Sequence, residues 1–443
     1  MSSAAALDTR IHSSIYVKLS YDDAATPERP AEGGLPLTPA RLVACVCAAQ
    51  VCAQIGAYTW PALLPVFMSE WHLTNREAGW ITGVLYAAYA AAVPILVTLT
   101  DRIDARRVYL SGVALTIASH LGFAAFAEGF WSALALRALA GVGWAGTYMT
   151  GLKLLADRVD PVLMSRAVAG HAASIGIAGS FSFVFAGTLG QWYGWRAASM
   201  AGGVMTVVAW LMVFTWVPAQ QRLAHHAPSG ALFDFRPILR NRSAMAYALG
   251  YWAHTWEMNA LRGWAVAFLT YVAATTGETV WLAPTTIAML MGLVGTWVSV
   301  AGNEASIRLG RQRLVRLAMT GSALCGAVIG FVGPRSYPLA AALVLVYGLL
   351  IWLDSSSLTA GAAGSADPQR RGATLAVHSM SGYIGGFIGP IVIGWILDAS
   401  GGMSVTGWGL AFLHVGLVMV VGQVAFRLLA PRDLTGDRSA SRR

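Results

Sequence analysis

Apolar and polar positions follow a long-range pattern in this chain, because runs of apolar residues between residues 42 and 430 are separated by short polar interruptions. Each run approaches the roughly 20 residues that an α-helix needs to cross the hydrocarbon core of a bilayer. The pattern predicts an all-α polytopic membrane protein with twelve transmembrane helices. These spans are expected at 42–68, 78–99, 108–127, 131–155, 167–190, 197–217, 245–272, 281–303, 314–333, 338–363, 373–397 and 407–430.

The composition agrees with a membrane protein. Hydrophobic residues make up 56% of the 443 residues and charged residues only 12%, against about 25% charged residues in soluble domains. The mean hydropathy is +0.58. All four cysteines lie inside predicted spans, where we expect small apolar residues and no disulfide framework.

The longest polar interruption between spans, 218–243, divides them six and six. It is therefore predicted to be a cytoplasmic loop between an N-terminal six-helix bundle at 41–217 and a C-terminal six-helix bundle at 244–430. The polar residues 1–40 have no apolar signal-peptide core and are expected to form a disordered cytoplasmic tail. Residues 431–443 are expected to form a second cytoplasmic tail.

Basic residues fix the expected orientation. The chain carries a formal net charge of +9, and its Lys and Arg residues gather in alternate loops, which is the topology signal of membrane proteins. With both termini cytoplasmic, the external loops hold only Arg76, Arg196 and Arg335. We therefore expect a multi-pass protein of a bacterial inner membrane. The placement of these charges in short loops disfavours nucleic acid as a partner.

The two halves of the chain resemble each other at a nearly constant spacing. The matched pairs are Arg102 and Arg308, Arg107 and Arg313, His171 and His378, and Ser174 and Ser381. Two six-span halves in the same orientation form the parallel repeat of a two-bundle transporter. For His171 and His378, the repeat favours a structural role at the bundle interface.

The charged octet 101–108, between spans two and three, carries an Asp-Arg-x-x-x-Arg-Arg pattern. It resembles the signature loop of the major facilitator superfamily, although Asp104 stands where the family pattern has glycine. A second stretch, residues 137–143 in span four, is similar to the Arg-x-x-x-Gly-x-Gly element of that family. The resemblance implies alternating access around a central cavity lined by spans one, four, seven and ten. It also implies a conformational gate in the charged loop, at Asp101, Arg102, Arg106 and Arg107.

Only two acidic residues fall deep inside predicted spans: Glu257 in span seven and Asp354 in span ten. Intramembrane charges are costly and are candidates for function by default. His254 lies about 60° from Glu257 on a helical wheel and shares its face, whereas Arg262 lies about 140° away. A mid-membrane carboxyl group suits a proton carrier because desolvation favours its neutral form. A structural polar network between helices is the alternative.

Span four adds two cations. Arg137 can bind an anionic substrate group through its rigid fork of donors, or it can serve as a structural or coupling residue. Lys153 lies near the inner end of the same span. It can take part in transport, or its ammonium group can extend to the membrane interface. Tyr148 aligns with Asp354 in the repeat, so we expect both to face the cavity.

Span one carries polar side chains one turn apart, at Gln50, Gln54 and Tyr58. They can hydrogen-bond a substrate from the cavity wall. A polar stripe in a membrane helix can equally join neighbouring helices. The sequence does not decide between these roles.

The sequence predicts a transporter and not an enzyme. It contains no Walker loop, no metal-ligand spacing and no recognisable Ser-His-Asp motif. We therefore expect no cofactor, with a proton or other ion gradient as the energy source. Three cations and two acids within the membrane favour a small anionic or zwitterionic organic solute. Proton-coupled symport is the preferred mode, because span five lacks the Gly-Pro pair that is typical of drug-antiporter relatives.

Two alternatives stay open. The first is a proton-driven exporter of hydrophobic or drug-like compounds, which the many aromatic residues support. The second is a membrane receptor or scaffold that keeps the fold without transport. In the leading hypothesis the protein works as a monomer surrounded by membrane lipid.

Overall fold

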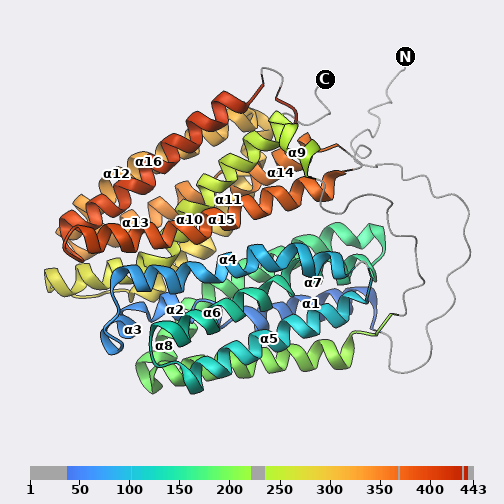
Figure 1. Ribbon diagram of the computed structural model, residues 1–443, viewed down its shortest axis with the longest axis horizontal. Helices are drawn as coiled ribbons and strands as arrows, with labels where there is room; N and C mark the ends of the chain where they lie inside the picture. Colours follow the sequence, from blue (N-terminus) through green and yellow to red (C-terminus); the bar gives the residue numbers. More distant parts are fainter. Residues whose placement is uncertain (1–36, 101, 221–234, 368–369, 432–433, 438–443) are drawn as a thin grey trace, which may run out of the picture.

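The computed structural model describes residues 37–100, 102–220, 235–367, 370–431 and 434–437. Within these ranges the regular structure consists of α-helices and one short 3-10 helix, which confirms the all-α prediction. The helices form two bundles that lie side by side, with α1 to α8 in one and α10 to α16 in the other (Figure 1). The bundle boundaries at the tails and at 218–243 stay predictions, because those segments lie largely outside the described residues.

The helices of the first half follow the predicted spans one to six. They are α1 (Pro39–Gln54), α2 (Thr59–Ala62), α3 (Leu64–Glu70), α4 (Asn75–Leu99), α5 (Ala105–Phe126), α6 (Phe130–Ala145), α7 (Tyr148–Ala156) and α8 (Pro161–Trp216). Helix α8 contains both spans five and six. The backbone turns between them at Gly194, whose φ of 83° is a conformation that glycine adopts without steric cost.

The helices of the second half follow spans seven to twelve. They are the short α9 (Arg236–Arg240), α10 (Arg242–Thr276), α11 (Pro284–Leu309), α12 (Arg311–Val332), the 3-10 turn η1 (Gly333–Arg335), α13 (Tyr337–Trp352), α14 (Ser355–Ser365), α15 (Arg371–Ala399) and α16 (Val405–Leu429). Spans one, four and ten are interrupted, at residues 55–58, 146–147 and 353–354. Each of them was expected from the hydropathy pattern as one continuous span.

Eight helical segments in the described ranges are long and apolar enough to cross a membrane. One of them contains spans five and six, and the predicted spans one, four and seven are not among the eight. The arrangement is therefore consistent with twelve spans. The spans that are broken or more polar are those that the family resemblance assigns to the cavity.

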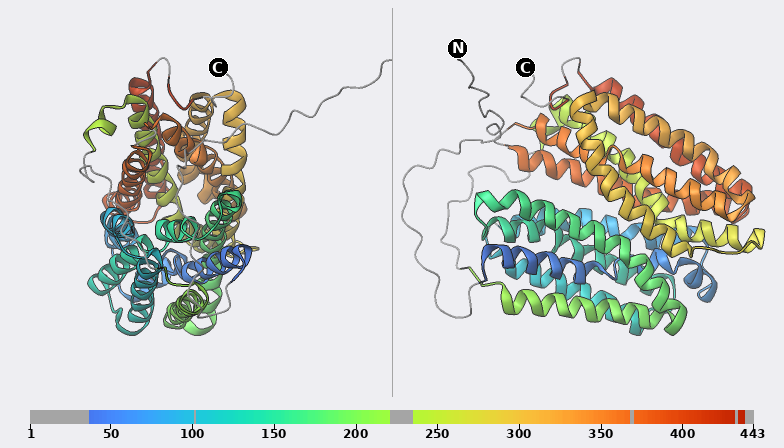
Figure 2. Two further views of the ribbon diagram at one scale, coloured as in Figure 1. Left: turned by 90° about the vertical axis from the view of Figure 1, so that its right-hand side faces the viewer. Right: turned by 180° about the vertical axis from the view of Figure 1, so that it is seen from behind.

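The two bundles meet at the end where α3 stops and α4 begins, which is the predicted external end (Figures 1 and 2). There the Asp398 carboxylate of α15 accepts a hydrogen bond from Asn75 Nδ2 at 2.8 Å and another from the Arg76 backbone N–H at 2.9 Å. Glycine allows this approach, because a Cβ at Gly394 would lie 2.1 Å from the Asn75 carbonyl oxygen. Helices α4 and α15, and also α8 and α11, pack against each other across the bundle boundary.

At the opposite end, the charged loop of the first half is organised by Asp104. This residue caps α5 and is 7% exposed. Its carboxylate accepts hydrogen bonds from the Arg106 backbone N–H at 3.0 Å, from Arg158 Nη2 at 2.7 Å and from the Gln220 backbone N–H at 2.8 Å. Burial opposes ionisation, but these donors hold the pKa of Asp104 below its ordinary value. Helix α5 therefore starts three residues before the predicted span.

The predicted gate residues lie around this centre. Arg106 donates to the Phe214 carbonyl oxygen at 2.6 Å, within the same bundle. Arg102 and Arg107 are exposed. Asp101 lies outside the described residues. The loop between α4 and α5, which we call the first joint, thus depends on Asp104. In the sequence this residue stood out only as a departure from the family pattern.

The equivalent loop of the second half lacks its own carboxylate. Gly310 occupies the position of Asp104, with a φ of 87°. Asp437, from the segment after α16, supplies the acceptor instead, because its Oδ1 accepts the Gln312 backbone N–H at 2.7 Å. Arg311 Nη1 donates to the Gly436 carbonyl oxygen at 2.7 Å, and Leu434 is buried beside these residues. A segment distant in sequence therefore completes the second joint.

Candidate functional site

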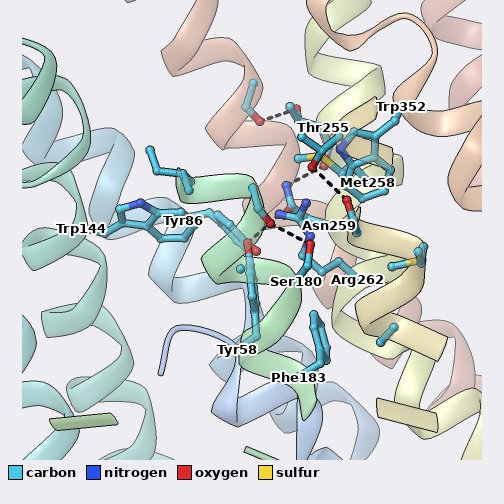
Figure 3. A pocket seen from close by; sticks show the side chains of 18 of the residues that line it. Tyr58, Tyr86, Trp144, Ser180, Phe183, Thr255, Met258, Asn259, Arg262 and Trp352 are labelled. Atoms are coloured by element: carbon cyan, nitrogen blue, oxygen red, sulfur yellow. Dashed lines mark hydrogen bonds between the residues drawn. The ribbon is translucent and has the colours of Figure 1, made fainter. Parts of the chain in front are cut away.

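A cavity of about 210 Å³ lies between the two bundles (Figure 3). Helices α4, α6, α7 and α8 of the first bundle line it, together with Tyr58 between α1 and α2. Helices α10, α11, α13 and α15 of the second bundle line the other side. Spans one, four, seven and ten thus contribute to the wall, as the family resemblance implies, and spans two, five, eight and eleven contribute as well.

Arg262 is the single charged residue among the described residues that line the cavity. Its Nη1 donates a hydrogen bond to the Tyr58 hydroxyl at 2.6 Å, which joins the second bundle to the first. The guanidinium carbon also lies 5.0 Å from the ring centres of Tyr58 and Trp352. Aromatic faces attract a cation at this distance. The arginine is therefore held in place without a carboxylate partner among the lining residues.

Helix α10 presents one polar face to the cavity. Tyr251, Thr255, Met258, Asn259 and Arg262 all line it, at spacings of three, four or multiples of them that place residues on one side of a helix. Asn259 is 2% exposed, and its Nδ2 donates to the Thr255 carbonyl oxygen at 3.0 Å. Its side-chain oxygen has no hydrogen-bond partner within the described part of the chain. This face can hydrogen-bond a bound solute.

Aromatic rings form most of the remaining wall. Tyr58 stacks on Phe183 with ring centres 5.2 Å apart, and Tyr58 meets Trp144 edge to face at 6.4 Å. On the α4–α15 side, Tyr383 stacks on Tyr89 at 3.8 Å. Figure 3 shows Tyr58 and Phe183 next to Arg262, with Tyr86 between this group and Trp144. One fixed cation within aromatic walls suits a solute that has an anionic group on an apolar body.

The intramembrane acids lie behind the cavity wall. Glu257 is wholly buried, does not line the cavity, and accepts a hydrogen bond from the Tyr347 hydroxyl at 2.8 Å. Asp354 is 1% exposed and does not line the cavity either. The expectation that it faces the cavity like Tyr148 is wrong for this arrangement, because the break between α13 and α14 turns it toward α10.

Asp354 instead meets His254, with Oδ1 and Nδ1 2.9 Å apart and both side chains buried. The pair is separated from the cavity by one residue, because the Tyr251 ring lines the cavity and stacks on the His254 ring at 5.6 Å. The Tyr251 ring also stacks on the His378 ring, with ring centres 4.1 Å apart. The second bundle thus has a buried polar layer next to the cavity, formed by His254, Glu257, Asp354 and His378.

The remaining candidates lie within the first bundle. Arg137 is 6% exposed and donates to the Ala57 carbonyl oxygen at 3.2 Å. Gln54 Nε2 donates to Thr147 Oγ1 at 3.4 Å, which joins spans one and four. Lys153 of α7 pairs with Asp157, the residue that follows this helix. None of the three lines the cavity, whereas Tyr58, Tyr148 and Arg262 do.

Sequence reasoning missed several lining residues. Asn259, Thr255 and Trp352 carry no charge, whereas the candidate residues were identified by charge inside the spans. A wheel of α10 centred on Arg262 would have found Asn259 and Thr255 on the same face. Trp352 had no such signal, because its place on the wall depends on the break that follows it in span ten.

Comparisons with known proteins agree with this architecture. The model of the Major Facilitator Superfamily matches residues 46–353. The chain belongs to this superfamily. Its fold is therefore that of superfamily members, and it is an integral multi-pass membrane protein.

Relatives in the superfamily include several spinster proteins. The human "Protein spinster homolog 1" is 25% identical over 308 residues, which cover 65% of this chain and 58% of the human protein. The mouse "Sphingosine-1-phosphate transporter SPNS2" is 23% identical over 374 residues, covering 78% and 67%. The chain thus spans little more than half the length of the human relative.

A solved structure has the same fold. It is a bacterial homologue of the human lysosomal transporter spinster in an inward-facing and occupied conformation, with a TM-score of 0.74 at 14% identity. The match covers 90% of this chain and 98% of that one.

Proposed function

We propose that the protein is a secondary active transporter that moves a small organic anion across the membrane by proton-coupled symport. The observation that carries this proposal is the position of Arg262. It is the single charged residue among the described residues that line the cavity between the two bundles. A guanidinium in such a low-dielectric site attracts an anion far more strongly than it would in water.

The aromatic walls define the rest of the solute. Rings such as Phe183, Trp144 and Trp352 favour an apolar or aromatic body, and the amide of Asn259 can accept or donate a hydrogen bond. The name of the mouse relative describes transport of sphingosine-1-phosphate, which joins a phosphate to an apolar chain. This supports the anionic class and does not name the solute of this chain.

Arg262 also offers a way to couple binding to closure. Its hydrogen bond to Tyr58 crosses from one bundle to the other. An anion bound at the guanidinium would compete with the Tyr58 hydroxyl for the same N–H donors. Binding would thereby alter one of the contacts that hold the bundles together, which is the requirement for a ligand to shift a conformational equilibrium.

Glu257 is the proposed proton carrier, with the His254–Asp354 pair as the adjoining polar element. A buried carboxyl group that hydrogen-bonds one hydroxyl can exist with or without its proton. In this proposal a proton gradient drives transport, no cofactor takes part, and the monomer in membrane lipid is the working unit. Both termini lie in the cytoplasm of a bacterium, and the protein resides in the inner membrane.

The substrate class can be tested by counterflow in proteoliposomes with a panel of labelled carboxylates, sulfonates and phosphate monoesters. We expect Arg262→Gln to reduce counterflow of an accepted anion by about a hundredfold, because a hydrogen bond to a charged group contributes about 1.5–3 kcal/mol. Arg335→Gln, at an exposed residue of the predicted external side, should leave it unchanged. Equal counterflow by Arg262→Gln and the parent would remove Arg262 from the site.

The aromatic wall also supports a second candidate, the proton-driven export of hydrophobic compounds. In that case uncharged aromatic compounds would exchange as well as anions, and an inward proton gradient would expel them. A protein that folds but exchanges no solute in any arm would favour the receptor or scaffold hypothesis.

A further inference from the structure

A groove separate from the central cavity lies on the outer surface of the C-terminal bundle, at the predicted cytoplasmic ends of α12 and α16. It measures about 360 Å³. The two helices pack along each other at the edge of the molecule (Figure 1), so residues from both reach the same groove. The lining residues are Arg313, Arg316, Leu317 and Thr320 of α12 with Gln423, Val424 and Arg427 of α16.

The groove is strongly basic. Three of its lining residues are arginines and none is acidic. Arg313 and Arg427 are exposed, and neither makes a side-chain hydrogen bond or ion pair with another described residue. Arg316 Nε donates to the Gln312 carbonyl oxygen at 3.3 Å, which leaves its other donors available. Three guanidinium groups thus surround one space without a protein anion among the lining residues.

The floor of the groove is held by hydrogen bonds. Gln423 Nε2 donates to Thr320 Oγ1 at 3.0 Å and to the Arg316 carbonyl oxygen at 3.2 Å, which joins α16 to α12. The arginines therefore project from two helices whose relative position is fixed. A preformed arrangement of this kind reduces the cost of ordering the site when a ligand binds.

Exposed apolar side chains continue from the groove toward the middle of the membrane. On α12, Leu317 is 57% exposed and Leu324, seven residues further on, is 66% exposed. On α16, Val424 is 52% exposed and Leu417, seven residues before it, is 57% exposed. A spacing of seven keeps residues on one face of a helix. The basic groove therefore ends an apolar stripe that faces the hydrocarbon core.

We propose that this groove binds the headgroup of an anionic phospholipid, with its acyl chains along the stripe of Leu317, Leu324, Leu417 and Val424. Arginine forks match phosphate oxygens, and basic pockets between helices on the cytoplasmic side suit anionic headgroups. A free phosphate would use the arginines but not the stripe. The site lies outside the central cavity, so it is independent of the proposed transport function.

The test measures lipid binding by the purified full-length protein in detergent micelles doped with phosphatidylglycerol or phosphatidylcholine, using native mass spectrometry. The groove variant changes all three groove arginines to glutamine. The control removes the same charge from three exposed arginines of the same predicted face, Arg166, Arg240 and Arg371. We expect the groove variant to bind phosphatidylglycerol about a hundredfold more weakly, since each basic residue contributes a few-fold near an anionic surface.

Parent and control should prefer phosphatidylglycerol to phosphatidylcholine to the same degree. Equal losses in control and groove variant would overturn the proposal, because general surface charge would then explain the binding. Unchanged binding by the groove variant would also overturn it.

A second arm separates a lipid from a free anion. Inorganic phosphate is added at the concentration of the lipid phosphate, and the apolar variant Leu317→Gln with Val424→Gln retains all three arginines. We expect phosphate to leave lipid binding in place and the apolar variant to weaken it. Displacement by phosphate, together with full binding by the apolar variant, would show an anion site and not a lipid site.

Discussion

The two halves of the repeat bury their acidic groups in different places. In the first half the buried carboxylate is Asp104, at the joint between α4 and α5, and no acid falls inside a predicted span. In the second half the buried carboxylates are Glu257 and Asp354 within the spans, and the joint has Gly310 where the first half has Asp104. The same arrangement of helices therefore holds a buried carboxylate in the α4–α5 joint of the first half, and buried carboxyl groups inside the spans of the second half, behind the wall of the shared cavity.

This difference indicates that the two bundles have different roles. Both bundles contribute aromatic rings to the cavity wall, but the buried cation of the first bundle, Arg137, donates to a backbone carbonyl away from the cavity. The second bundle contributes Arg262, the polar face of α10 and the buried acids. If the difference has functional meaning, changing the acids of the second half should alter energy coupling, whereas changing Asp104 should alter stability.

The largest expected effect is on coupling. Glu257→Gln keeps the volume and a hydrogen-bonding group beside Tyr347 but cannot release a proton. We expect proton-driven uptake to fall at least tenfold while counterflow exchange continues, measured in proteoliposomes with and without an imposed pH gradient. Glu304→Gln, an exposed acid on α11, is the matched control. Unchanged driven uptake by Glu257→Gln would remove the proposed asymmetry in coupling.

The next effect is on stability and belongs to the first half. Asp104→Ala leaves the Arg158 guanidinium buried without its carboxylate, which is 2.7 Å away in the parent. Breaking a buried pair in this way costs about 3–5 kcal/mol. We expect a clear fall in the apparent melting temperature of the purified protein, with Asp160→Ala as the control, because the Asp160 side chain makes no capping hydrogen bond. A melting temperature equal to that of the parent would show that the joint does not depend on Asp104.

Acidification should weaken the interactions of the Asp104 carboxylate without any substitution. The pKa of Asp104 is lowered in the folded protein by hydrogen bonds from Arg158, Gln220 and Arg106, against the opposing effect of burial. Its contribution to stability is therefore present above the ordinary aspartate pKa and is lost as the pH falls through the lower folded value. We expect the parent to lose stability more steeply than Asp104→Asn on acidification below about pH 4. Parallel pH profiles would contradict this origin of the acid sensitivity.

Much of the fold could be predicted, because apolar run length and charge placement are local properties. The spans follow the hydropathy pattern closely, and Gly194 alone separates two spans within α8. The breaks at 55–58, 146–147 and 353–354 were missed, since no single residue type causes all three.

The candidate site was predicted less well. Intramembrane charge correctly drew attention to span seven, where Arg262 lines the cavity. The helical wheel placed Glu257 and Arg262 about 140° apart. It could not tell which of these two faces of span seven meets the cavity and which meets α13. The contact of Asp437 with the second joint was beyond reach, because it joins residues far apart in the sequence.

The smallest expected effect tests the second joint. Asp437 accepts the Gln312 backbone N–H as a helix cap does. Unlike Asp104, it comes from outside the loop, and its carboxylate lies next to Gly310. Replacing a capping side chain costs about 1 kcal/mol, so Asp437→Ala should lower the apparent melting temperature by much less than Asp104→Ala. Thr435→Ala is the control, because Thr435 bonds Ser243 through its backbone N–H, which the substitution keeps. If Asp437→Ala costs as much as Asp104→Ala, the carboxylate supplied by the tail is equivalent to the internal one, and the joints differ in connectivity alone.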